Sequence, residues 1–191
     1  MAVGHGEIRG ILSTGAPCPI GPNPHRRGRP LKRVIMSAID DRLKSLGIVL
    51  PTPAAPVANY VPFVVHGSLL IISGQLALGA DGTIAPEHKG KIGATVSPED
   101  AKAAARVCAI NLLAQAKAAL GDLGRIERCV RLGGFMNTAP GFSAIAPIMN
   151  GASDLIVEVL GDKGRHARST IGVAEVPLES AVEVEAMFAV S

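Results

Sequence analysis

The chain has 191 residues, and nearly half of them are hydrophobic, which suffices for one domain of ordinary size with a buried core. No hydrophobic run approaches the ~20 residues that a membrane-spanning helix requires, which argues against a membrane protein. The net charge of +3 is concentrated at the N-terminus: residues 1–35 hold six Lys and Arg against one Glu, and the remainder holds thirteen against fifteen acids, which disfavours a nucleic-acid partner.

The first 35 residues are rich in proline and glycine and show neither a continuous hydrophobic stretch nor a helical period. They are predicted to be disordered, with a natural start at Met36 as the alternative explanation. Residues 36–191 are predicted to form a single domain. Its first part, residues 36–53, is expected to be a short helix capped by Ser37, followed by a proline-rich extended arm.

Two short strands are predicted next, over residues 60–65 and 68–74, because β-branched residues dominate and His66-Gly67 marks a turn between them. The strongest helix signal follows, over residues 97–120, with Ser97 as the N-cap and Pro98 in the first turn. Hydrophobic residues at steps of three and four give this helix one face to pack on a sheet. That face consists of Ala105, Ala109, Leu112, Ala116 and Leu120.

A third strand is predicted over residues 126–136, and a second long helix from Phe142 or Ser143 to Leu160. The last two strands are expected over 168–176 and 181–190. This order of elements predicts an α+β fold, with a mixed β-sheet and two helices packed on one face. The other face would expose Val and Ile residues, so the pattern predicts that it is buried between subunits.

The cysteine and histidine residues form no pattern typical of a disulfide framework or a metal site. The three cysteines, Cys18, Cys108 and Cys129, are widely spaced and odd in number, which indicates a reducing, cytoplasmic compartment. The five histidines are scattered and are interpreted as surface or loop residues. They are His5, His25, His66, His88 and His166.

Charged residues interrupt the hydrophobic C-terminal strands. The period of two places Glu183 and Glu185 on one face of their strand, and Arg168 and Thr170 on one face of the preceding strand. In a simple hairpin of these strands, Arg168 would lie roughly 20 Å from Glu183. Either the strands are not neighbours, or the two residues combine across a subunit interface. From the spacing alone, the simpler interpretation is surface charge on half-exposed strands.

Several separated motifs resemble the Rid family of reactive intermediate deaminases, also called L-PSP endoribonuclease-like proteins. They are HARSTIGVAEVP and VEVEA near the C-terminus and YVPFVVHGSLLIISGQ earlier in the chain. The resemblance covers about residues 54–190, and the middle segment with GFMN and MNGASDL is similar to a longer-chain subgroup. It implies a chorismate-mutase-like fold and a homotrimer with small-molecule clefts between subunits. It also implies a last strand that inserts between earlier strands.

The resemblance further implies site residues. Arg168 corresponds to the arginine that anchors the substrate, and Glu183 to the acid that positions water. The substrate-binding positions are Tyr60, Ser73, Gly74, Asn150 and Thr170. Thr170 stands where the archetype often has cysteine, which rules out a role for a thiol there. Alternatively, Tyr60 could simply pack and Gly74 could serve a β-bulge; Glu185 is assigned a structural or rim role.

The implied reaction is the hydrolysis of enamine and imine acids, such as 2-aminoacrylate, to 2-oxo acids and ammonia. Arg168 would bind the substrate carboxylate through two parallel hydrogen bonds, and Glu183 would orient the attacking water. No metal or organic cofactor is required. Two alternatives remain: a non-catalytic trimer that binds 2-oxo acids, and an endoribonuclease, which the mildly acidic body of the chain disfavours.

Overall fold

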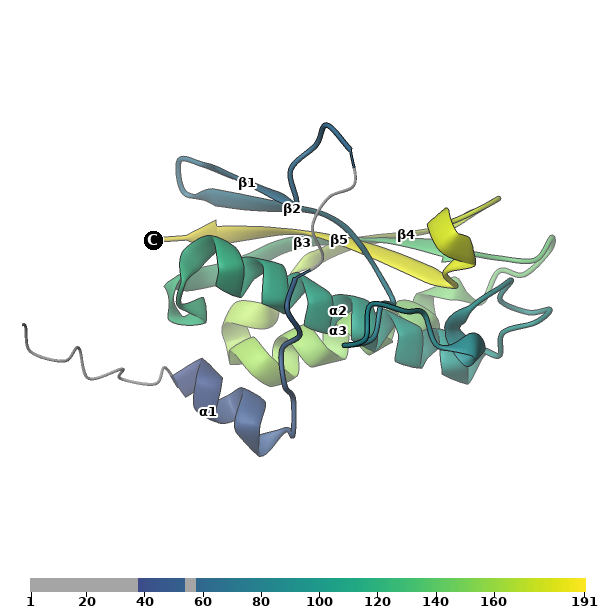
Figure 1. Cartoon of the computed structure of the whole chain (residues 1–191), viewed down its shortest axis with the longest axis horizontal. Helices are drawn as coiled ribbons and strands as arrows, with labels where there is room; N and C mark the ends of the chain where they lie inside the picture. The colour runs from purple at the N-terminus through teal and green to yellow at the C-terminus, as the bar shows by residue number, and fades with distance from the viewer. Residues whose placement is uncertain (1–37, 54–57) are drawn as a thin grey trace, which may run out of the picture. The chain divides into compact units, whose positions relative to one another are not determined.

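A five-stranded sheet with the strand order β1-β2-β5-β3-β4 forms the centre of the fold (Figure 1). The computed structural model describes residues 38–53 and 58–191, so the predictions for residues 1–35 and for Ser37 lie outside the described residues. β3 and β4 are parallel and the other neighbours are antiparallel, which confirms the mixed sheet. The strands are β1 Phe63–His66, β2 Leu69–Leu76, β3 Ile126–Asn137, β4 Ala167–Val173 and β5 Val182–Val190.

The last strand, β5, lies between β2 and β3 and runs antiparallel to both. A simple hairpin of the last two strands is therefore wrong, and the inserted strand implied by the family resemblance is confirmed. The reason is topological: a helix connects β3 to β4, and this crossover places β4 on one edge of β3. The other edge of β3 is thus left to pair with β5.

Two helices, α2 (Pro98–Leu120) and α3 (Ile145–Leu160), cover one face of the sheet, as predicted (Figure 1). The Ser97 hydroxyl accepts a hydrogen bond from the Asp100 N–H at 3.0 Å, which confirms the expected N-cap of α2. The predicted hydrophobic face of α2 is buried throughout. The two helices approach closely at Gly151, where a Cβ atom would lie only 2.0 Å from the Lys102 carbonyl oxygen.

By length and composition alone, α2 could cross a membrane, but 61% of its most hydrophobic stretch is buried inside the protein. Its basic residues pair with acids of neighbouring helices. Arg106 contacts Glu158 of α3 at 2.9 Å, and Lys117 contacts Asp40 of α1 (Ala38–Ser45) at 3.0 Å. These are the contacts of a core helix within a folded domain.

The helix α1 is the predicted N-terminal helix, and it packs against α3 and the turn before β3 rather than on the sheet. Its Leu43 is buried, and the Arg42 Nε donates a hydrogen bond to the Glu158 carbonyl oxygen at 2.8 Å. Gly47 adopts a φ of 68° just after the helix, the conformation in which glycine commonly ends a helix. The sheet therefore carries two helices, and the third lies outside this layer.

Several predicted boundaries differ from the structure, and three of the differences have a clear physical reason. Tyr60 precedes β1 because Pro62 lies between them, and α3 begins at Ile145 instead of 142 or 143 because Pro140 and Gly141 form a turn. The strand β4 ends at Val173 instead of 176. Its partner β3 ends opposite that residue, at Asn137, so no further ladder bonds are available.

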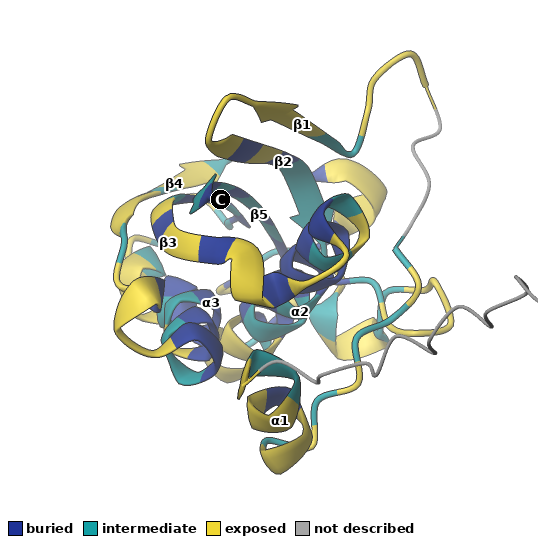
Figure 2. Cartoon of the chain, turned by 90° about the vertical axis from the view of Figure 1, so that its left-hand side faces the viewer, coloured by how far each residue is buried: buried dark blue, intermediate teal, exposed yellow. Residues whose placement is uncertain are grey.

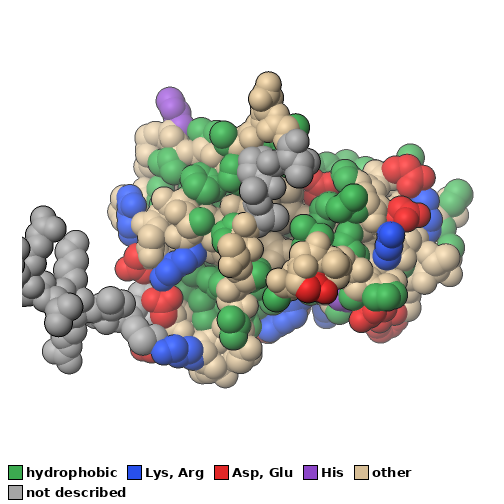
Figure 3. Space-filling view, in the orientation of Figure 1, with side chains coloured by type: hydrophobic (Ala, Val, Ile, Leu, Met, Phe, Trp, Pro, Cys, Tyr) green, Lys and Arg blue, Asp and Glu red, His purple; other side chains and the backbone are tan. Residues whose placement is uncertain are grey.

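The second face of the sheet is not covered by a helix of the described ranges, and Figure 2 shows exposed residues along β1 and in the first part of β2. Hydrophobic side chains lie at the outer surface around this hairpin (Figure 3). The exposed members on this open face include Val64, Leu69, Ile71 and Ile171. The expectation of an exposed hydrophobic face is confirmed, and such a face is typical of a surface that another subunit buries.

Candidate functional site

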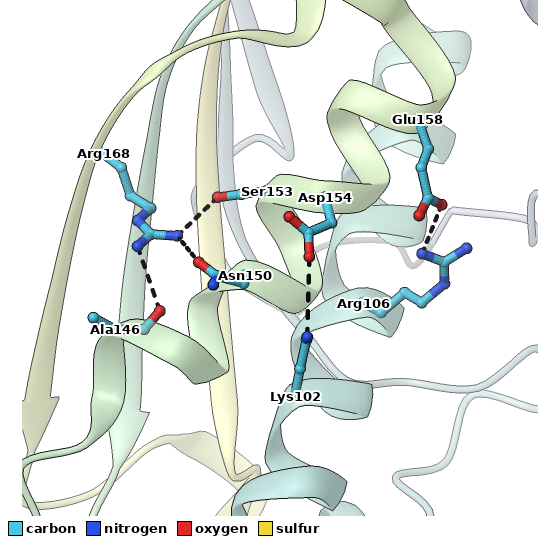
Figure 4. Close-up of polar contacts among 8 residues, drawn as sticks. All are labelled: Lys102, Arg106, Ala146, Asn150, Ser153, Asp154, Glu158 and Arg168. Atoms are coloured by element: carbon cyan, nitrogen blue, oxygen red, sulfur yellow. Dashed lines mark hydrogen bonds and ion pairs between the residues drawn. The ribbon is translucent and has the colours of Figure 1, made fainter.

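Arg168 lies near the start of β4 and points toward α3 (Figure 4). Its Nη1 donates hydrogen bonds to the Asn150 Oδ1 at 2.7 Å and the Ser153 Oγ at 3.1 Å, and its Nη2 donates to the Ala146 carbonyl oxygen at 3.4 Å. All three acceptors are neutral. No carboxylate of the described residues forms an ion pair with Arg168, so its positive charge is not compensated there.

These bonds leave one edge of the Arg168 guanidinium open. Both N–H groups of Nη1 are used, and within residues 38–53 and 58–191 the Nε–H and the second Nη2–H have no partner. Nε and Nη2 form one edge of the planar group, and donors on such an edge match the two oxygens of a carboxylate. Arg168 is exposed, so this edge is accessible to a small anionic ligand.

Thr170 follows on the same face of β4, two residues after Arg168. Its Oγ1 is buried and is the one such side-chain oxygen without a hydrogen-bond partner in the described part of the chain. Buried hydroxyl groups are nearly always bonded, so an unpaired one indicates a missing partner. We call Asn150, Arg168 and Thr170 the arginine half-site.

Glu183 lies at the start of β5, with its side chain over Gly74 of β2. A Cβ atom on Gly74 would lie 1.7 Å from the Glu183 Oε1, so glycine leaves room for the carboxylate in the position that it occupies. Between Ile72 and Gln75, β2 advances three residues while β5 advances two, which defines a β-bulge at Ser73-Gly74. The β-bulge interpretation of Gly74 is therefore confirmed, and its assignment as a substrate-binding residue stays a prediction.

Ser73 connects this bulge to the segment that carries Tyr60. Its Oγ donates to the Val61 carbonyl oxygen at 2.9 Å, and its N–H donates to the Pro62 carbonyl oxygen at 3.0 Å. Tyr60 is 53% exposed, so it does not serve as a core residue within one chain. We call Tyr60, Ser73, Gly74 and Glu183 the glutamate half-site.

The two glutamates of β5 share one face, as predicted, but differ in their partners. The Glu185 Oε1 accepts a hydrogen bond from the Arg131 Nη1 at 3.2 Å, whereas none of the described cations pairs with Glu183. Burial, and secondarily the charge of Glu185, raise the pKa of Glu183 above its ordinary value. A carboxylate with a raised pKa is a stronger base, as acid–base catalysis near neutral pH requires.

Replacing Glu183 with glutamine is expected to raise the melting temperature at neutral pH. Because the pKa of Glu183 is raised in the folded state, its stabilising contribution is complete below the ordinary pKa of 4.5 and is lost as the pH rises through the raised pKa. Glutamine resembles the protonated acid, so the gain should shrink toward zero at about pH 4. Thermal denaturation at both pH values measures the difference, and a gain that does not depend on pH would exclude this explanation.

Within one chain, the two half-sites lie on opposite faces of the sheet. Arg168 is paired with Leu132 of β3, and its side chain faces α3. Glu183 is paired with Phe135 of β3. Its neighbours along β5 are buried under the helices, so its own side chain points to the opposite face. With β3 between their strands, the two Cα atoms are roughly 14 Å apart, and the side chains diverge. One small molecule therefore cannot contact both residues of the same chain.

Neither a metal-binding cluster nor a reactive thiol is found among the described residues. In residues 38–53 and 58–191, no three His, Cys, Asp or Glu side chains come together to hold a metal ion. Cys108 and Cys129 are free and buried, and burial raises the pKa of the Cys129 thiol to about 12. Such thiols are poor nucleophiles at neutral pH.

Sequence reasoning missed two residues beside Arg168. Ser153 contacts its guanidinium, and His166, interpreted above as a loop histidine, is half-buried and contacts Ser153. One signal was available for Ser153: its spacing of three from Asn150 places both residues on one side of α3. No comparable signal exists for His166, because its contact depends on how α3 packs beside β4.

The strand order and the two helices on one face define an α+β protein with one sheet. The two half-sites add a cationic and an anionic group at its surface. A family model described as "YjgF/chorismate_mutase-like, putative endoribonuclease" matches residues 40–190. The chain belongs to this family, the Rid family that its motifs indicate.

Individual relatives agree with this assignment. Protein TCP17 of Trypanosoma cruzi is 46% identical over 146 residues, which cover 76% of this chain and 89% of the relative. The structure of protein Atu1372 from Agrobacterium tumefaciens is 45% identical, with a TM-score of 0.74 over 80% of this chain and 92% of that one. A structure from Shewanella oneidensis, described as a "putative endoribonuclease", is 33% identical, with a TM-score of 0.77 over 81% of this chain and 100% of that one.

Proposed function

We propose that this protein is a deaminase that hydrolyses reactive imine and enamine acids, such as 2-aminoacrylate, to 2-oxo acids and ammonia. The observation that carries the proposal is the exposed guanidinium of Arg168, which neutral oxygens orient and whose two-donor edge is open. The implied substrates and products all carry a carboxylate that fits this edge. In the family context, the E. coli protein TdcF, which shares the fold, has a structure with bound serine.

The proposed active site lies between two copies of the chain in a homotrimer. The arginine half-site of one copy would face the glutamate half-site of the next, because the two cannot meet within one chain. The exposed hydrophobic residues of the open face supply a surface for this association. The unpaired Thr170 hydroxyl would then find its partner in the substrate or in the neighbouring copy.

The reaction requires water to add to the carbon of the C=N bond. Glu183 would accept a proton from this water while the C–O bond forms, and would return the proton to the nitrogen. The hydroxyl proton of the resulting carbinolamine then passes to its nitrogen, the C–N bond breaks as the C=O bond forms, and ammonia leaves the 2-oxo acid. An enamine reaches the same path after tautomerising to the imine. Arg168 fixes the carboxylate and therefore the distance between the water and the reacting carbon.

A coupled assay tests this function. A threonine dehydratase generates the imine in situ, and the purified protein should accelerate the release of ammonia and 2-oxobutanoate. If the rate is unchanged, but 2-oxobutanoate binds and the binding depends on Arg168, the protein is a ligand-binding trimer instead. If neither turnover nor binding occurs, the proposed function is wrong.

A further inference from the structure

A continuous chain of hydrogen bonds leads from Arg168 into the interior behind it. The Ser153 Oγ lies 3.1 Å from the Arg168 Nη1 and 3.0 Å from the His166 Nε2. The His166 Nδ1 in turn lies 2.6 Å from the carbonyl oxygen of Gly164, which is buried. Ser153 and His166 are both half-buried, and neither contacts the glutamate half-site.

With a neutral His166, each bond in this series of hydrogen bonds has a defined direction. The Gly164 carbonyl can only accept, so the His166 Nδ1 carries the hydrogen. In the neutral imidazole the Nε2 is then an acceptor, and the Ser153 hydroxyl donates to it. The Ser153 oxygen keeps its lone pairs for the Arg168 N–H. Each donor therefore has one acceptor, and the two hydrogen bonds of the Ser153 hydroxyl hold it in one orientation.

These hydrogen bonds orient the Arg168 guanidinium without neutralising its positive charge. A carboxylate in the place of Ser153 would bind the guanidinium more strongly, but it would also compete with an anionic ligand. The nearest carboxylate on α3, Asp154, pairs instead with Lys102 of α2 at 4.0 Å (Figure 4). The full positive charge of Arg168 thus remains available at the open edge.

We propose that Ser153 and His166 are positioning residues for Arg168: they set the plane of its guanidinium so that the Nε–Nη2 edge faces the bound carboxylate. The inference rests on the proposed function, since it assigns to both residues a role in substrate anchoring. His166 acts through Ser153, and Ser153 acts through Arg168. Neither residue is expected to touch the reacting atoms.

The test compares Ser153→Ala with Ser153→Thr, and His166→Leu with His166→Gln. Alanine at position 153 and leucine at position 166 break the series of hydrogen bonds. Threonine at position 153 keeps the hydroxyl, and glutamine at position 166 keeps a polar group near the position of the His166 Nε2. The broken variants should raise KM, and the Kd for 2-oxobutanoate, about tenfold, with kcat changed less than about threefold. The two conservative variants should restore most of the affinity. Asp154→Asn is the matched control, because it breaks only an exposed ion pair one residue away and should leave KM unchanged.

A second readout does not depend on turnover. In the ligand-free wild type, an oriented guanidinium should give separate ¹⁵N–¹H signals for the Nη groups of Arg168 at low temperature, and these signals should merge in Ser153→Ala and His166→Leu. Separate signals that persist in both broken variants, together with an unchanged KM, would overturn the inference. If the wild type neither binds nor hydrolyses its substrates while the signals merge as expected, the orienting chain stands and the proposed function fails.

Discussion

Replacing Arg168 with alanine is expected to lower kcat/KM for imine hydrolysis by about a hundredfold to a thousandfold. The guanidinium supplies both donors of the carboxylate-binding edge. The described residues that hydrogen-bond to it are all neutral, so none of them can supply the lost positive charge. Loss of the anchor removes the charge and the orientation of the substrate together. Steady-state kinetics with imines generated by a dehydratase, and calorimetry with 2-oxobutanoate, measure the two effects separately.

Arg168→Lys is the informative control for this substitution. Lysine keeps the charge but cannot form two parallel hydrogen bonds or bond to three acceptors of α3 in one plane. It should therefore recover only a small part of the lost activity. If the Arg168→Ala variant is as active as the wild type, Arg168 is not part of the active site.

Replacing Glu183 with glutamine is expected to lower kcat by about a hundredfold to ten-thousandfold, with a much smaller change in KM. Glutamine keeps the size of the side chain over Gly74 but cannot accept a proton from water. Glu185→Gln is the matched control, since Glu185 lies on the same face two residues away and is already paired with Arg131. It should retain most of the activity.

The pH dependence of kcat in the wild type gives a second test of the role of Glu183. Because burial and the neighbouring Glu185 raise the pKa of Glu183, its basic form is lost as the pH falls through a value above the ordinary 4.5. The acidic limb of kcat should therefore lie at a higher pH than for an exposed glutamate. The limb should be absent from the residual activity of Glu183→Gln, and a limb that persists there would assign it to another group.

The local features of the fold could be predicted from the sequence because short-range patterns encode them. Alternation placed Glu183 and Glu185 on one face of β5, and Ser97 and Pro98 defined the start of α2. The position of β5 could not be predicted from these patterns. Its partners β2 and β3 lie far away in the sequence, and local residues do not encode such pairings; only the family motifs implied them.

The site could be predicted in part for the same reason. The family motifs indicated Arg168 and Glu183, but they did not show that these residues face opposite sides of the sheet. The structure adds that fact, and it also distinguishes Glu183 from the paired Glu185. His166 lies in the loop before β4, as predicted, but its contact with Ser153 could not be predicted, because it depends on how α3 packs beside β4, which no sequence period reveals.

The most direct test of the composite site is subunit complementation between Arg168→Ala and Glu183→Gln. Each variant alone should be almost inactive, but in a randomly mixed cyclic oligomer roughly a quarter of the clefts would join an intact arginine half-site to an intact glutamate half-site. Co-refolded mixtures should therefore regain activity. A mixture of Arg168→Ala with the double variant, which has no Arg168, should not. A co-refolded mixture of the two single variants that stays as inactive as its components, while refolded wild type is active, would contradict a site shared between two chains.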